Sequence, residues 1–215
     1  MENPFLTIAA IAFYLSVSSH MVFYGHAVES PKYTLIHSES DYEIRLYKDI
    51  LWMSALLQGT SSFQFQKSTK DGFHRIYQYI HGANLNSSQL PMTAPVLTSI
   101  TTSASNTLYY VKLFLSKGNP PQANPELNLQ LDRWKAQCIA VRKFPGFAED
   151  NNVKKEMAGL VASLNKHLTT TGQMAALDGN SSYTIAQYNS SRIASGRLNE
   201  VWIDVSGFNV EGCLY

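Results

Sequence analysis

The sequence predicts an α+β fold: a distorted, mainly antiparallel β-barrel of two pseudo-symmetric halves with two flanking α-helices. Three observations lead to this prediction. A strand, strand, helix, strand, strand order occurs twice, with an offset of somewhat under ninety residues. Most connections are too short for the crossover that parallel strands require. The eight or nine strands expected can hide their edges by closing into a barrel or a strongly curved sheet, with both helices outside.

The first half begins with apolar and charged residues alternating over residues 42–46, which predicts a half-buried strand. A more buried strand follows at 51–57 and ends at a Gly-Thr-Ser-Ser turn. A helix is expected from about Phe65 to His81, closed by Gly82, because glycine tolerates the left-handed conformation at a helix end. Two strands, at 96–100 and 109–115, complete this half.

The second half repeats this order with alternation at 127–131, a strand at 138–141 and a Pro-Gly turn. Its helix is expected over 150–168, and its last strands over 183–188 and 200–205. One stripe of this helix is apolar and predicts ordinary core packing: Val153, Met157, Leu160, Val161, Leu164 and Leu168.

Composition favours one compact domain. Of 215 residues, 45% are apolar and 15% charged, which excludes a disordered, solvating chain. Seventeen basic groups almost cancel sixteen acidic ones, and no Lys/Arg cluster stands out. Without a basic excess there is no field to hold a phosphate backbone, so we expect no nucleic-acid partner.

The N-terminus resembles a targeting segment. Residues 5–17 are apolar, and Gly25 and Ala27 put small side chains where signal peptidase requires them. We expect a signal peptide over residues 1–27, a domain over 28–215, and no stable membrane span after cleavage. An uncleaved signal anchor remains open, because residues 21–24 extend the apolar stretch.

Other features agree with a secreted protein or one of the endomembrane lumen, either extracellular or vacuolar. Asn86, Asn180 and Asn189 each begin an Asn-x-Ser sequon in Ser-rich surroundings, so we expect a glycoprotein. Cys138 and Cys213 are the two cysteines, and an oxidising lumen would let them form a disulfide. A buried thiol and a separate tail thiol are equally open at this point.

Five segments in this order resemble the SOUL haem-binding protein family, in particular plant members with a signal peptide. They are Tyr42-Glu43-Ile44-Arg45, Met92-Thr93-Ala94-Pro95-Val96, residues 141–148 (VRKFPGFA), Ala186-Gln187-Tyr188-Asn189 and Asn199-Glu200-Val201-Trp202. The resemblance implies a curved barrel of two halves with two helices, which agrees with the repeat. It also implies non-covalent, reversible binding of haem or another tetrapyrrole in an apolar groove beside the first helix.

The same resemblance places candidate ligand contacts. One well-studied branch has a basic rim residue that falls on Lys70, an apolar contact on Phe73 and an aromatic contact on Tyr188. Helical spacing then adds His74 and Tyr77, which lie near one face with Lys70 and His81. The simpler alternative for Phe73 and Tyr77 is core packing. His74 could ligate iron, but it fits groove lining better, and His81 suits the helix dipole more than a metal.

Another branch has been proposed to use a histidine directly after the Glu-Ile-Arg segment as axial ligand, and here that position is Leu46. We therefore expect apolar contact and propionate pairing to exceed any iron bond, so that a metal-free porphyrin or a chlorophyll breakdown product is equally admissible. The chain contains none of the common catalytic or metal-ligand motifs, so we expect a carrier, buffer or sensor and no enzyme. The alternatives are an enzyme acting on a small apolar metabolite in the same groove and a secreted protein-interaction module.

Overall fold

The computed structural model describes residues 28–59, 63–103, 106–116, 118–170, 182–208 and 210–213. The expected signal peptide, Asn180 and the side chain of Leu168 lie outside the described residues. Within them, the elements are, in chain order, β1 (Tyr33–Ser38), β2 (Glu43–Gln58), α1 (Phe65–Ile80), β3 (Val96–Thr102), β4 (Thr107–Phe114), the 3₁₀ turn η1 (Pro125–Leu127), β5 (Leu129–Pro145), α2 (Val153–Thr170), β6 (Tyr183–Gln187) and β7 (Leu198–Asp204).

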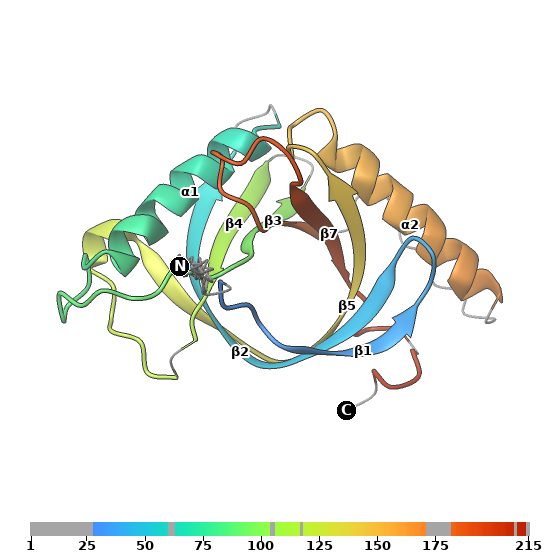
Figure 1. Cartoon of the computed structure of the whole chain (residues 1–215), viewed down its shortest axis with the longest axis horizontal. Helices are drawn as coiled ribbons and strands as arrows, with labels where there is room; N and C mark the ends of the chain where they lie inside the picture. Colours follow the sequence, from blue (N-terminus) through green and yellow to red (C-terminus); the bar gives the residue numbers. More distant parts are fainter. Residues whose placement is uncertain are drawn as a thin grey trace, which may run out of the picture.

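The strands form one antiparallel sheet in the order β1-β2-β4-β3-β6-β7-β5, and β2 also pairs with β5. That last pairing closes the sheet into a barrel of every strand except β1. β1 pairs with the first part of β2, and β4 pairs with the last part. Both helices lie on the outside of this ring (Figure 1).

The internal repeat is confirmed. β2, α1, β3 and β4 correspond in order to β5, α2, β6 and β7, so β1 is the one strand among the described residues without a counterpart. The halves meet at two seams, β3 with β6 and β2 with β5. Thr98, in the middle of β3, lies opposite Ile185 in the middle of β6, as expected for a pseudo-twofold axis through this seam.

The expected number of strands was wrong, because each half begins with one long strand where the sequence predicted two. β2 runs through the polar residues Lys48 and Asp49, although Asp49 has a φ of 52°. The pairing with β5 keeps the same register on both sides of this residue. Likewise β5 joins the two strands expected at 127–131 and 138–141, while Leu127 belongs to η1. The described residues therefore form seven strands instead of eight or nine.

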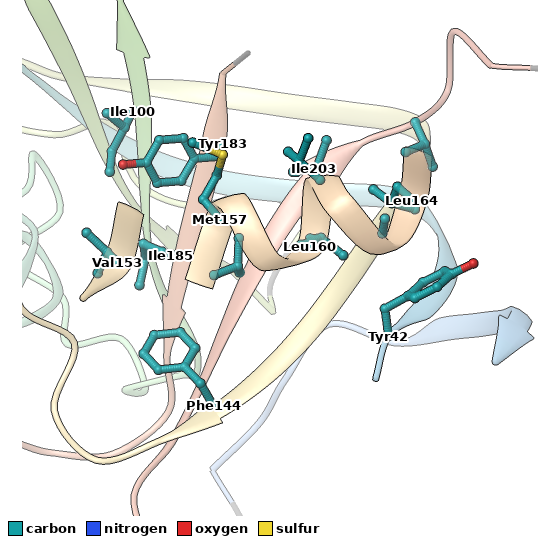
Figure 2. Packing of buried hydrophobic residues seen from close by; sticks show 14 of the residues in the cluster. Tyr42, Ile100, Phe144, Val153, Met157, Leu160, Leu164, Tyr183, Ile185 and Ile203 are labelled. Carbon is teal, nitrogen blue, oxygen red and sulfur yellow. The ribbon is translucent and has the colours of Figure 1, made fainter. Parts of the chain in front are cut away.

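α2 packs its predicted apolar stripe against the outside of the second half (Figure 2). Val153 and Leu160 are fully buried, and Met157 and Leu164 nearly so. They contact side chains of β5, β6 and β7, including Phe144, Ile185 and Ile203 (Figure 2). Cys138 of β5 and Cys213 form a disulfide with their Cα atoms 5.8 Å apart, which fastens the C-terminal segment to this side of the barrel.

A separate cluster fills the face of the strands that points away from both helices. It contains Trp52, Trp134 and Trp202, with Tyr47, Leu97 and other residues of the barrel strands. Trp52 and Trp134 lie with ring centroids 5.2 Å apart, and Tyr47 stacks on Trp202 at the same distance. Because the helices cover the outside of a closed sheet, this aromatic cluster is the interior of the barrel.

Candidate ligand-binding site

The first helix is held close to the barrel by a glycine. A Cβ atom at Gly72 would lie 2.5 Å from a methyl group of Val111 and 2.8 Å from one of Leu57, closer than real Cβ atoms approach. The Thr69 and Thr98 hydroxyls share a 2.8 Å hydrogen bond, and Arg75 donates to the Leu56 carbonyl at 2.8 Å. α1 is therefore a fixed platform, and its outer face is determined by this docking.

The face of α1 that bears Lys70 and His74 points outward, opposite a buried face. Ile76, Tyr79 and Ile80 are buried against the sheet, whereas Lys70 and His74 are exposed. The Tyr79 hydroxyl donates to the Pro121 carbonyl at 2.8 Å, and burial raises the pKa of Tyr79 to about 12. The helix ends at Ile80, one residue earlier than expected, and the following Gly82 has a φ of 107°.

A hollow of about 500 Å³ lies on the outer face of α1, and we call it the α1 hollow. It is lined by Lys70, Asp71, Phe73, His74 and Tyr77. The rings of Phe73 and Tyr77 are 6.1 Å apart and inclined by 57°, so they form an apolar wall. The structure thus brings together four of the five candidate ligand contacts.

Asp71 also lines the α1 hollow, although the sequence did not place it among the ligand contacts. Its carboxylate accepts a hydrogen bond from the Lys67 ammonium at 2.6 Å, one helical turn away. The signal in the sequence was the adjacent pair of opposite charges, Lys70-Asp71, inside a helix whose neighbouring positions were already assigned to a groove.

The two histidines of α1 have different surroundings. His74 Nδ1 lies 3.3 Å from the Gln78 amide nitrogen, at the edge of the α1 hollow. His81 Nδ1 lies 2.8 Å from the Tyr77 carbonyl oxygen, so this nitrogen bears the proton and donates. The His81 ring stacks on Tyr77 with centroids 3.9 Å apart. His81 therefore binds the last turn of the helix, as expected, and orients Tyr77.

Tyr188, the fifth candidate, does not line the α1 hollow. Its hydroxyl donates to Glu200 at 2.8 Å, and the indole nitrogen of Trp202 donates to the same carboxylate oxygen at 2.7 Å. Burial and then the charge of Glu200 raise the pKa of Tyr188. Because Trp202 belongs to the interior cluster, this tyrosine is part of a polar network inside the barrel and lies apart from the outer face of α1.

That network centres on an ion pair between β2 and β7, the two strands that flank β5. Arg45 and Glu200 are each 2% exposed, and their two hydrogen bonds measure 3.0 and 3.2 Å. Arg45 also contacts Glu43, which receives a 2.7 Å hydrogen bond from Lys143. Burial alone would lower the pKa of Arg45, but the charge of Glu200 raises it above its usual value. Burial alone would raise the pKa of Glu43, but the hydrogen bonds from Lys143 and Arg45 hold it below its usual value.

The remaining candidate positions are placed as follows. Leu46 is buried on the α2 side of β2, opposite Cys138, and so lies away from the α1 hollow. Asn86 is exposed, whereas the Asn189 side-chain oxygen accepts the Leu198 N–H at 2.7 Å.

Two kinds of feature are absent from the described residues. No three His, Cys, Asp or Glu side chains in them are grouped to hold a metal ion. No helix in this part of the chain has the length and apolar character to span a membrane.

Comparison with known proteins agrees with this architecture. The model of the family described as SOUL heme-binding protein matches residues 28–204. This chain belongs to that family. Among SOUL relatives, Heme-binding protein 2 of Homo sapiens is 26% identical over 168 residues, which are 75% of this chain and 77% of the human protein. Heme-binding protein 1 of Xenopus laevis is 25% identical over 166 residues, or 75% and 82% of the two chains.

The fold extends beyond SOUL proteins. The crystal structure of the EcmrR C-terminal domain matches with a TM-score of 0.51 at 11% identity, covering 80% of this chain and 96% of that one. At this identity the likeness concerns the fold alone. The residues of the α1 hollow and of the interior network must therefore be judged on their own chemistry.

Proposed function

We propose that this protein binds haem or another tetrapyrrole, non-covalently and reversibly, in the α1 hollow, and acts as a carrier, buffer or sensor. Membership of the SOUL family and the names of its relatives, heme-binding proteins 1 and 2, support the ligand class. The proposal is of a binding protein and not of an enzyme.

One observation supports this site above all: an apolar wall of Phe73 and Tyr77 stands beside the ammonium group of Lys70 around one hollow. Ligand sites are typically mostly apolar concavities of roughly 300–1,000 Å³ with a few polar groups that set orientation. A tetrapyrrole plane can pack on the two rings while one carboxylate pairs with Lys70.

Iron ligation has a small role in this proposal. His74 is the histidine that lines the α1 hollow, and Leu46 gives no ligand. Apolar contact and carboxylate pairing therefore supply most of the binding free energy.

Titration of the protein with haemin and with metal-free protoporphyrin tests the proposal directly. We expect saturable binding of both with similar affinity, because the iron contributes little. If neither porphyrin shows saturable binding below about 100 μM, the proposed function is refuted. A strong preference for haemin that is lost in His74→Ala would refute the minor role of iron.

Variants locate the site. Tyr77→Leu and Phe73→Leu keep apolar volume but remove the flat rings, so we expect weaker binding of both porphyrins by several-fold. Lys70→Ala removes the carboxylate partner. Lys155→Ala makes the same change at an exposed position of α2 and is the matched control. Equal effects of Lys70→Ala and Lys155→Ala would place the ligand elsewhere.

We also propose that the protein follows the secretory route, with cleavage after Ala27 and glycans at Asn86, Asn180 and Asn189. The disulfide between Cys138 and Cys213 supports this, since such bonds persist in oxidising compartments. N-terminal sequencing of the protein from secreting cells tests the cleavage, and an intact Met1 would contradict it. The mass of the same protein before and after glycosidase treatment tests the glycans, and an unchanged mass would contradict them.

A further inference from the structure

Few charged side chains lie around the α1 hollow, and they differ in whether they have a partner. α1 contains three basic side chains and one acidic side chain besides His74, namely Lys67, Lys70, Arg75 and Asp71. Arg75 turns toward the sheet, where it donates to the Leu56 carbonyl. The hollow is thus lined by one cation, Lys70, and one anion, Asp71.

Asp71 also forms an ion pair with a second cation, Lys67. It binds Lys67 at 2.6 Å, with side chains 70% and 44% exposed for the lysine and the aspartate. Lys70, by contrast, has no acidic partner within the described part of the chain. One ammonium group is therefore available for a ligand, and the next nearest is already paired.

A ligand with two neighbouring carboxylates meets a problem at this site. One carboxylate can pair with Lys70. A second carboxylate inside the hollow lies near Asp71, which lines it as well, or must displace Asp71 from Lys67. Like charges at short range repel. A ligand with a single carboxylate avoids both costs.

We propose that the α1 hollow selects tetrapyrroles with one carboxylate over those with two, and that Asp71 sets this preference. The inference rests on the proposed function, since it assigns a ligand class to the same site. Haem-like dicarboxylates still bind, but a monocarboxylate is the better match to one available ammonium group.

The size of the effect follows from the exposure of these groups. Two unit charges roughly 6–8 Å apart in a water-like dielectric change an affinity by about two- to three-fold. Salt weakens the effect, because at 1 M ionic strength the screening length falls to about 3 Å.

Three ligands with the same ring isolate the carboxylates: protoporphyrin, its monomethyl ester and its dimethyl ester. Each is titrated against the wild-type protein and against Asp71→Asn, with Glu211→Gln as the control that removes an exposed carboxylate near the C-terminus. We expect the wild type to bind the monomethyl ester at least as tightly as the diacid. Asp71→Asn should raise the affinity for the diacid about three-fold relative to the monomethyl ester, and high salt should abolish this gain.

The outcomes separate the two proposals. If none of the three porphyrins binds, the proposed function fails and this inference fails with it. If they bind but the wild type prefers the diacid, or Asp71→Asn changes the diacid and monoester affinities equally, the ligand class is wrong while the binding site stands. A gain for the diacid in Glu211→Gln as large as in Asp71→Asn would also overturn the role of Asp71.

Discussion

The interior ion pair allows a test of how much burial changes the contribution of one carboxylate to the free energy of unfolding. Arg45 contacts two glutamates, but Glu200 is 2% exposed and Glu43 is 22% exposed. Removing one partner of a buried pair leaves an uncompensated charge and costs about 3–5 kcal/mol, whereas partly exposed pairs are worth about 0–1 kcal/mol. We therefore expect Glu200→Ala to lower the free energy of unfolding by about 4 kcal/mol and Glu43→Ala by about 1 kcal/mol.

Glu200 has further hydrogen-bond partners, which add to the free energy lost when its carboxylate is removed. Tyr188 and Trp202 both donate to its carboxylate, and they lose their acceptor in Glu200→Ala. Unsatisfied buried donors cost about 1–3 kcal/mol each unless water replaces the acceptor. Glu43 has one further partner, the half-exposed Lys143, which can return to water.

Guanidinium unfolding followed by tryptophan fluorescence measures these differences, since Trp52, Trp134 and Trp202 all lie in the interior cluster. The double variant Arg45→Met with Glu200→Met removes both charges. The free energy that it costs should therefore be smaller, by at least about 2 kcal/mol, than the sum of the costs of Arg45→Met alone and Glu200→Met alone. Equal costs for Glu200→Ala and Glu43→Ala, or a cost below about 1.5 kcal/mol for Glu200→Ala, would refute the reasoning.

Three further predictions concern the docking of the elements. Gly72→Ala should lower the free energy of unfolding by about 1–3 kcal/mol, because its methyl group overlaps Val111; a neutral or stabilising change in thermal unfolding would contradict this. Cys213→Ser should cost about 4 kcal/mol, because its disulfide closes a separation of 75 residues; an unchanged unfolding midpoint would exclude the bond. Burial raises the pKa of Tyr42 and of Tyr79 from 10 to about 12, so the unfolded state loses these protons first. The free energy of unfolding should therefore change little below about pH 10 and fall toward pH 12. A smaller fall in Tyr42→Phe and in Tyr79→Phe would assign the effect to these two residues.

Local patterns were sufficient for most elements. The apolar stripe of α2 and the Gly82 helix end both follow from patterns within a single helix. The same holds for the face that brings Lys70, His74 and Tyr77 to one hollow, since residues three and four apart on a helix are neighbours. Strand boundaries were less accurate, because Lys48 and Asp49 look like a turn although hydrogen bonds to β5 continue past them.

The sequence by itself therefore determined the repeat, the helices and the exposed face of α1, all of which depend on neighbours along the chain. Only the tertiary structure decided that Arg45 meets Glu200, 155 residues away, and that Tyr188 belongs to their network inside the barrel. Closure of β2 onto β5 brings these strands together, and no local pattern encodes which side chains a closed sheet will place opposite one another. The same closure leaves the ring of Tyr188 inside the sheet and Lys70 outside it, so two residues assigned to one groove lie on different sides of the barrel wall.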